Sequence, residues 1–274
     1  MAYKTLVLDL DGTLTNSEKK VSKKTKSAIM NIQEMGIRVI LASGRSDYGM
    51  NHIAKELELA KYKNYMISFN GSRIRDLYND KLLYEQNIDP SLYPEIFKLW
   101  REYGVNILTY NREINKMYTG DEKDIYAIID AQINNYIPLI ELKDFEKELD
   151  FPVAKFLFMQ DPIKLEWIEK DMQKRMGDKL DIYRSESCFL EVMPKGVNKG
   201  NALAKLSELA SLDPAEMIAC GDSFNDISMI KFAGLGVAME EAVDELKEAA
   251  DYITKSNDDD GVVDVIEKFI ISDI

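Results

Sequence analysis

Two aspartates near the N-terminus, Asp9 and Asp11, lie where a buried strand is expected to end. Residues 4–8 form an apolar, partly β-branched run, which predicts a strand covered on both faces, as in a parallel sheet. Gly12 and Thr13 follow as turn residues. Burying a carboxylate is costly unless it is paired or binds a metal, and two neighbouring carboxylates repel each other. The structural alternative is an Asx turn that merely ends the strand.

A second pair of acids, Asp222 and Asp226, follows another apolar stretch at residues 217–220. If both strands end at the same edge of a parallel sheet, four carboxylates converge there. Such crowding raises their pKa values unless a divalent cation neutralises them. The chain has one histidine, so oxygen ligands must dominate, and these favour Mg²⁺. The sequence therefore predicts a magnesium site that involves Asp9, Asp11, Asp222 and Asp226.

A basic and a hydroxyl side chain are expected at the same edge. Lys199 stands in the first turn of a predicted helix, where the helix dipole favours acids, so a cation there suggests an anionic ligand. Ser43 follows the predicted strand 37–42 and offers a short hydroxyl donor. Metal, lysine, hydroxyl and loop N–H groups together form a phosphate cradle, and the carboxylates supply a nucleophile and an acid/base.

These residues belong to four motifs, Asp9-x-Asp11-Gly12-Thr13, Ser43-Gly44-Arg45, Lys199-Gly200 and Gly221-Asp222-x-x-Asn225-Asp226. In this order, across the whole chain, they resemble the motifs of the haloacid dehalogenase-like hydrolase superfamily. Further stretches resemble its Cof-like subfamily, which carries a type IIB cap. They are Phe69-Asn70-Gly71, Glu191 ahead of Pro194-x-Gly196-Val197-x-Lys199-Gly200, and Ser256-Asn257-Asp258-Asp259-Asp260-Gly261-Val262.

The resemblance implies a role for each motif residue. Asp9 is expected to attack phosphorus, and Asp11 to protonate the leaving alcohol and then activate water. The Asp9 carboxylate, the Asp11 carbonyl and Asp222 are expected to hold Mg²⁺, while Asp226 tunes the site and orients Lys199. The phosphoryl group is expected to be bound by Ser43, Lys199, Asn225 and the Gly12 backbone, with Gly44, Arg45 and Asn70 within reach.

The order of predicted elements indicates an α/β fold with two domains. Strand, helix, strand, helix, strand with short connections over residues 4–69 predicts a Rossmann-like parallel sheet. The pattern resumes after Pro194. Between them, capped helices and short strands predict an α+β cap domain on an antiparallel sheet. The expected ranges are residues 1–81 and 191–274 for the catalytic core and residues 82–190 for the inserted cap.

Composition limits the partners. The net charge of −13 argues against nucleic acid or an anionic membrane surface. No apolar stretch is long enough to span a membrane, and the chain enters a strand at once rather than a signal peptide. Cys188 and Cys220 are expected to be reduced core thiols, which indicates a cytoplasmic protein. We further expect a monomer or weak homodimer whose partner is a small phosphorylated metabolite.

The predicted function is Mg²⁺-dependent hydrolysis of a sugar phosphate or similar phosphomonoester through an aspartyl-phosphate. One alternative is a phosphomutase of the phosphomannomutase kind, and another is a non-catalytic phosphate-binding signalling module. Glu240-Glu241 departs from the Gly-Asn usual in the family, which leaves the transfer of substrate preference open. Asn257–Gly261 lacks the ligand spacing of a calcium loop and is expected to be a solvated turn or helix cap.

Overall fold

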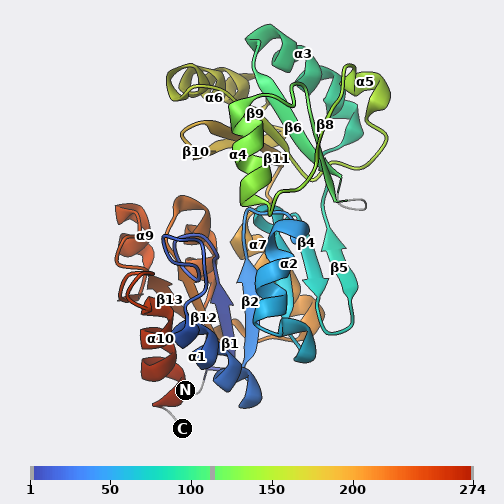
Figure 1. Cartoon of the computed structure of the whole chain (residues 1–274). Helices are drawn as coiled ribbons and strands as arrows, with labels where there is room; N and C mark the ends of the chain where they lie inside the picture. The colour runs from blue at the N-terminus through green and yellow to red at the C-terminus, as the bar shows by residue number, and fades with distance from the viewer. Residues whose placement is uncertain (1–2, 112–114, 273–274) are drawn as a thin grey trace. The chain divides into compact units, whose positions relative to one another are not determined.

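The computed structural model describes residues 3–111 and 115–272, which form two compact units (Figure 1). The first unit comprises residues up to Gly44, Met50–Glu85 and Asn198 onward; the second comprises Arg45–Gly49 and Gln86–Val197. These boundaries differ by a few residues from the expected 81/82 and 190/191. The strand at Lys81–Glu85 pairs within the sheet of the first unit, and the strand at Phe189–Pro194 pairs within that of the second.

The first unit is built on an eight-stranded sheet in the order β14-β13-β12-β1-β2-β3-β4-β5. The six strands from β14 to β3 are parallel, whereas β4 and β5 add an antiparallel edge. The strands are β1 (Thr5–Leu8), β2 (Arg38–Ala42), β3 (Tyr65–Ser68), β4 (Arg73–Asp76), β5 (Lys81–Glu85), β12 (Met217–Gly221), β13 (Leu235–Ala238) and β14 (Tyr252–Ile253).

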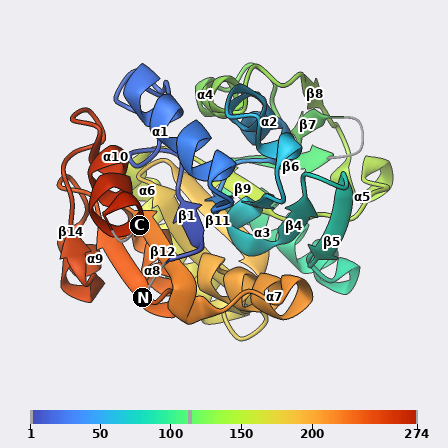
Figure 2. The same ribbon diagram turned by 90° about the horizontal axis from the view of Figure 1, so that it is seen from below.

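Helices cover both faces of this sheet, as Figure 2 shows from below. Alternate residues of β1 point to opposite sides: Leu6 and Leu8 pack with α1, α2 and α10, and Val7 packs with α7, α8 and α9. The central strand is therefore buried on both faces, as its unbroken apolar run predicted. The helices are α1 (Lys23–Glu34), α2 (Asp47–Glu56), α7 (Lys199–Ala210), α8 (Ile227–Phe232), α9 (Asp244–Ala249) and α10 (Gly261–Ile266).

The second unit contains a six-stranded sheet in the order β10-β11-β9-β6-β7-β8. Its pairs are antiparallel except β7 with β8, which run parallel and so depart from the expected antiparallel sheet. Aromatic residues of α3 and β9 form the core with α6. The elements are α3 (Tyr93–Tyr103), β6 (Asn106–Asn111), β7 (Lys116–Thr119), α4 (Ile125–Ile133), β8 (Leu139–Glu141), α5 (Phe145–Glu148), β9 (Phe156–Met159), α6 (Pro162–Met176), β10 (Leu180–Glu186) and β11 (Phe189–Pro194).

Neither cysteine is in a disulfide, and Cys220 is buried, where desolvation raises the pKa of its thiol to about 12. Within residues 3–111 and 115–272, no helix has the length and apolar character needed to cross a bilayer.

Candidate active site

The acidic cluster forms where two central strands end. Asp9 follows β1 directly, and its backbone N–H donates to the carbonyl of Cys220 at 3.1 Å. Asp222 follows β12, the neighbour of β1, and Asp226 closes the short 3₁₀ turn Phe224–Asp226. One carboxylate oxygen from each of Asp9, Asp222 and Asp226 lies within 4.8 Å of the others. The structure thus brings together three of the four predicted acids.

Lys199 is a fully buried cation in contact with two of these acids. Its Nζ lies 2.6 Å from Asp9 Oδ1 and 2.5 Å from Asp226 Oδ1, and the side chain is 0 % exposed. The side chain of Asn198 caps the helix by accepting from the N–H of Asn201 at 2.8 Å, which fixes the start of α7 at Lys199. A Cβ on Gly200 would lie 2.4 Å from the carbonyl oxygen of Ser228, so this glycine allows α7 to approach α8 closely.

Asp226 has both carboxylate oxygens engaged by protein donors. Its Oδ2 accepts the backbone N–H groups of Asp222 and Ser223 at 3.0 Å each, while Oδ1 binds Lys199. A Cβ on Gly221 would lie 2.5 Å from the Cβ of Asp226, so the turn closes tightly around this carboxylate. Asp226 therefore orients Lys199 and shapes the loop that carries Asp222.

Asp222 is held against the first loop. Its Oδ1 accepts the hydroxyl of Thr13 at 2.8 Å. A Cβ on Gly12, whose φ is +85°, would lie 2.5 Å from Asp222 Oδ2, so Gly12 leaves the space that this carboxylate occupies. Thr13 was part of the first motif, but sequence reasoning assigned it no role. Its neighbour is 209 residues away in the chain, so only the fold reveals the contact.

The electrostatics of the cluster favour a bound cation. Burial raises the pKa of Asp9 well above its ordinary value; Lys199 opposes this shift, and the charges of Asp226 and Asp222 add to it. Burial and then the charge of Asp226 raise the pKa of Asp222 to about 7. Burial lowers the pKa of Lys199, but the carboxylates of Asp226 and Asp9 outweigh it and hold the pKa above the usual range. One lysine does not balance two buried acids and the half-buried Asp222, so the donor set fits a divalent metal ion.

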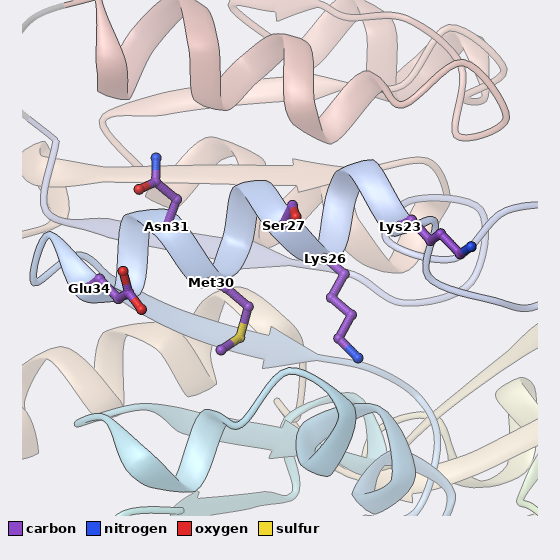
Figure 3. Close-up of a pocket in the computed structure, with 6 residues that line it drawn as sticks. All are labelled: Lys23, Lys26, Ser27, Met30, Asn31 and Glu34. Carbon is purple, nitrogen blue, oxygen red and sulfur yellow. The ribbon is translucent and has the colours of Figure 1, made fainter.

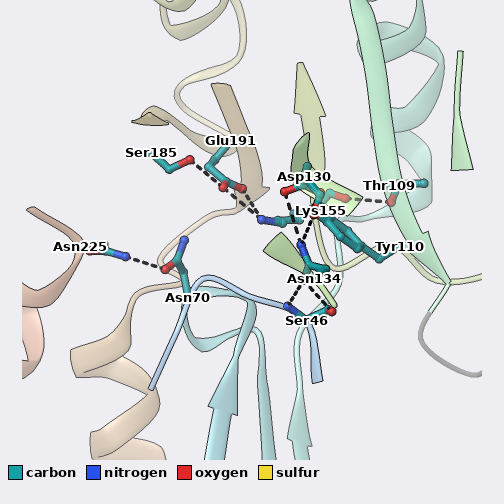
Figure 4. A network of polar contacts seen from close by, with 10 residues as sticks. All are labelled: Ser46, Asn70, Thr109, Tyr110, Asp130, Asn134, Lys155, Ser185, Glu191 and Asn225. Atoms are coloured by element: carbon teal, nitrogen blue, oxygen red, sulfur yellow. Dashed lines mark hydrogen bonds and ion pairs between the residues drawn. The ribbon is translucent and has the colours of Figure 1, made fainter. Parts of the chain in front are cut away.

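The predicted phosphate-binding side chains form a second group within the first unit. Asn225 Nδ2 donates to Asn70 Oδ1 at 3.0 Å (Figure 4), and Asn70 N–H donates to the carbonyl of Ser43 at 3.0 Å. A Cβ on Gly44 would lie 3.1 Å from Asn70 Oδ1. Asn70 adopts a left-handed backbone conformation with φ 53°. Ser43, Gly44, Asn70 and Asn225 are therefore neighbours, and Asn225 directly precedes Asp226.

Two predicted residues have other partners. Asp11 Oδ1 forms an ion pair with Lys19 Nζ at 2.9 Å, and sequence reasoning gave Lys19 no role. Arg45 is buried and falls in the second unit, where its charge is one of those that lower the pKa of Asp130. Glu241 is one of the two acids, Glu240 and Glu241, that depart from the family pattern. It accepts the N–H of Asn257 at 2.8 Å, and its charge contributes to the raised pKa of Asp222.

The second unit holds a buried polar network that sequence reasoning missed (Figure 4). Lys155 Nζ lies 2.9 Å from Glu191 Oε2, and both side chains are buried. Tyr110 donates to Asp130 at 2.6 Å. Asn134 joins the network to the segment after Ser43, because its Oδ1 accepts from the N–H and hydroxyl of Ser46 at 3.1 and 2.8 Å. Only Glu191 had a sequence signal.

The hollow in Figure 3 is a separate feature. It lies on the outer side of α1, and none of the predicted site residues lines it. The lining residues are Lys23, Lys26, Ser27, Met30, Asn31 and Glu34.

With this geometry established, comparison with known proteins identifies the family. The family model for haloacid dehalogenase-like hydrolases matches residues 6–266. The chain belongs to this family. A haloacid dehalogenase-like hydrolase from Bacteroides thetaiotaomicron is 40% identical, with 97% of this chain and 99% of that chain covered and a TM-score of 0.91. The 5-amino-6-(5-phospho-D-ribitylamino)uracil phosphatase of Bacillus subtilis is 32% identical, with 98% of this chain and 96% of that protein covered.

A sugar phosphatase of subclass IIB shares the fold at 22% identity, with 97% and 98% of the two chains covered and a TM-score of 0.81. These matches confirm the resemblance inferred from the four motifs and the α/β fold class. The haloacid dehalogenase-like chain is an enzyme of the phosphatase class, as predicted.

Proposed function

We propose that the protein is a Mg²⁺-dependent phosphatase that hydrolyses a small sugar phosphate or related phosphomonoester through an aspartyl-phosphate. The observation that carries this proposal is Asp9, a buried carboxylate that contacts Lys199 at 2.6 Å and lies beside Asp222 and Asp226. We also propose that the protein is cytoplasmic, which its two free cysteines support. We propose in addition that it is a monomer or a weak homodimer.

In the first half of the reaction, a carboxylate oxygen of Asp9 attacks phosphorus. The P–O bond to the leaving group breaks as Asp11 gives its proton to the departing oxygen. In the second half, Asp11 removes a proton from water, whose oxygen attacks phosphorus and releases Asp9 and inorganic phosphate. Asp11 is therefore protonated again at the end of the cycle, because it regains the proton that it gave to the leaving oxygen.

The remaining residues bind and orient the transferring group. Lys199 offers a cation in contact with Asp9, and the hydroxyl of Ser43, the amide of Asn225 and the N–H of Gly12 supply donors for the phosphoryl oxygens. Asp9, Asp222 and the carbonyl of Asp11 would hold Mg²⁺, which neutralises the charge on the carboxylates and the phosphoryl group when bound. Asp226 keeps Lys199 in place.

The substrate class draws its support from the relatives. The Bacillus subtilis relative acts on a phosphorylated ribityl compound, and a subclass IIB neighbour of the same fold is a sugar phosphatase. A panel of hexose phosphates, polyol phosphates, the ribityl compound, nucleotides, flavin mononucleotide and pyridoxal phosphate covers the relevant leaving groups. Release of inorganic phosphate supports a phosphatase, whereas an isomerised sugar phosphate without phosphate release identifies a phosphomutase.

The decisive variant is Asp9→Asn, which keeps the shape of the side chain and removes the nucleophile. We expect phosphate release to fall by about three orders of magnitude or more with an unchanged circular dichroism spectrum. Asp178→Asn makes the same chemical change at an exposed position and should keep full activity. Turnover by Asp9→Asn at the wild-type rate would exclude Asp9 as nucleophile.

Removal of the metal gives an independent test. We expect excess chelator to abolish phosphate release and added Mg²⁺ to restore it. Ca²⁺ should restore it poorly, because its looser coordination disturbs in-line attack. Full activity in excess chelator would contradict the metal requirement.

A further inference from the structure

Lys19 has no place in the four motifs, yet its side chain contacts a proposed catalytic carboxylate. Its Nζ lies 2.9 Å from Asp11 Oδ1, with the two side chains 59% and 33% exposed. Lys19 adopts a left-handed backbone conformation with φ 59°. A residue other than glycine needs support from its surroundings to hold this conformation.

The local turn around Lys19 provides part of that support. The side-chain oxygen of Asn16 accepts the N–H groups of Glu18 and Lys20 at 3.1 and 3.0 Å. Two backbone hydrogen bonds close the turn: Lys19 N–H donates to the carbonyl of Asn16 at 2.8 Å, and Asn16 N–H donates to that of Lys20 at 3.0 Å. Four hydrogen bonds therefore close the turn that contains Lys19, and one of them is donated by the Lys19 N–H itself.

The second source of support comes from the far end of the chain. We call residues Asn257–Asp260 the acidic turn. Asn257 Nδ2 donates to the carbonyl of Thr15 at 2.9 Å, and Asp258 Oδ1 accepts the N–H of Ser17 at 2.9 Å. The acidic turn thus contacts the loop just before Lys19.

The acidic turn also contacts the chain just after Lys19. Asp260 occupies the position before α10, but its side chain makes no cap hydrogen bond there. Its Oδ1 instead accepts the hydroxyls of Ser22 and Thr25 at the start of α1, the latter at 3.1 Å. Both ends of the loop that carries Lys19 are therefore tied to the acidic turn, which is more than the expected solvated turn or helix cap.

We propose that Lys19 is a positioning residue that fixes the carboxylate of Asp11 for proton transfer, and that the acidic turn holds Lys19 in place. The inference rests on the proposed function, in which Asp11 protonates the leaving oxygen. Lys19 itself transfers no proton: its ammonium group restricts rotation of the Asp11 carboxylate. An exposed ion pair adds little to folding stability, so its effect should appear in the reaction.

The test compares two aryl phosphates as probes. The nitrophenolate of p-nitrophenyl phosphate leaves with little need of a proton, whereas the more basic phenolate of phenyl phosphate depends on the general acid. The ratio of kcat/KM for phenyl phosphate to kcat/KM for p-nitrophenyl phosphate therefore reports how well Asp11 is positioned. A general loss of structure lowers both values and leaves the ratio unchanged.

Lys19→Glu and Lys20→Glu form a matched pair. Both make the same charge change on adjacent exposed residues, but Lys20 pairs with Glu18 at 3.0 Å instead of Asp11. We expect Lys19→Glu to lower the ratio about tenfold, a fraction of what a general acid contributes. Lys20→Glu should leave it unchanged, and Lys19→Arg, which keeps the cation, should retain most of it.

Equal ratios in Lys19→Glu, Lys20→Glu and the wild type would overturn the role of Lys19. If Asp9→Asn is inactive in the same assay, the proposed function survives that result. If Asp9→Asn turns over normally, the proposed function itself fails. The two failures are thereby distinguished.

Asn257→Ala tests the acidic turn. We expect it to lower the ratio about threefold in the wild-type background, because a looser loop holds Lys19 less well. In the Lys19→Glu background it should have no further effect. An equal loss in both backgrounds would show that the acidic turn does not act through Lys19 and would overturn that part of the proposal.

Discussion

Gly12 lies between Asp11, the proposed general acid, and Thr13, and the absence of a side chain at Gly12 is a structural requirement. Its φ of +85° lies in a region that side chains disfavour, and a Cβ would lie 2.5 Å from Asp222 Oδ2. Gly36 has nearly the same φ, +87°, but nothing lies within 4 Å of its Cβ position. Alanine substitutions at the two positions therefore distinguish the effect of backbone strain, which both share, from the displacement of the Asp222 carboxylate, which only Gly12 involves.

We therefore expect the left-handed conformation by itself to make Gly12→Ala and Gly36→Ala each lower the free energy of unfolding by about 1–2 kcal/mol. Gly12→Ala should also lower kcat/KM about 100-fold, because it displaces Asp222. Gly36→Ala should keep full activity. Urea unfolding and steady-state kinetics measure both quantities, and normal kinetics in Gly12→Ala would show that Asp222 need not stay where it is.

Lys199 neutralises buried carboxylates, so its loss should affect stability as well as catalysis. We expect Lys199→Met to lower the free energy of unfolding by about 3–5 kcal/mol, because Asp9 and Asp226 would remain buried without their cation. Adding Asp226→Asn to Lys199→Met should recover part of this loss. Urea unfolding followed by circular dichroism measures both; a further loss in the double variant would contradict this account.

At the scale of residues, the sequence motifs allowed the convergence of the acids to be predicted, but not the contacts made by residues outside the motifs. Asp9, Asp222 and Asp226 meet, as expected from acids that end neighbouring parallel strands. The contact of Lys19 with Asp11 could not be foreseen, because it depends on a left-handed turn held from residues more than 200 positions away. Arg45 is part of the second motif in sequence but falls in the second unit, and its expected contact with the phosphoryl group stays a prediction.

Helix α4 and strand β6 place an ionisable pair in the interior of the second unit. Asp130 on α4 accepts the hydroxyl of Tyr110 on β6, and burial raises the pKa of Asp130 from its ordinary value of 3.8 to about 6, although Lys155 opposes the shift. The folded protein therefore binds this proton more tightly than the unfolded chain does. Its contribution to stability is fully present below about pH 4 and is lost as the pH rises through 6.

Asp130→Asn removes this titration. The free energy of unfolding of Asp130→Asn, relative to the wild type, should rise by about 2 kcal/mol between pH 4 and pH 7. Both tryptophans, Trp100 and Trp167, lie in the second unit, so their fluorescence follows its unfolding in urea. Asp178→Asn, at an exposed position, should show no such trend, and a pH-independent difference for Asp130→Asn would contradict the raised pKa.

Strands with a clear apolar pattern could be predicted from the sequence, whereas edge strands and very short strands could not. The apolar stretch at residues 217–220 was expected as a strand and forms β12. Strand β5 lies at the edge of the sheet with exposed and half-buried residues, so its pattern resembled the start of the cap. Strand β8 has three residues, too few for alternation to be read, and its parallel pairing with β7 carries no local signal.

The whole molecule consists of two units with separate hydrophobic cores, and the acidic cluster lies in the first. A ligand that binds only the folded state stabilises it by about 2.7 kcal/mol at 100 times its dissociation constant. We expect saturating Mg²⁺ to slow hydrogen exchange in peptides from β1 and α7. Peptides from β9 and α6, in the core of the second unit, should exchange as before.

Asp222→Asn should abolish this protection, because it removes a carboxylate that we propose as a metal ligand. Mass spectrometry of the exchanged peptides measures the effect without any turnover. Protection of the β1 peptide by Mg²⁺ that is as strong in Asp222→Asn as in the wild type would place the ion elsewhere.

The position of β1 between β2 and β12 has a consequence for synthesis of the chain. Asp9 leaves the ribosome early, but Lys199 and β12 are made about 190 and 210 residues later, roughly 10–40 s at ordinary elongation rates. Residues 86–197, nearly all of the second unit, emerge in that interval and carry a core of their own. The unit inserted between the halves of the sheet is thus synthesised in full before Lys199, the cation that contacts Asp9 in the folded protein, has been made.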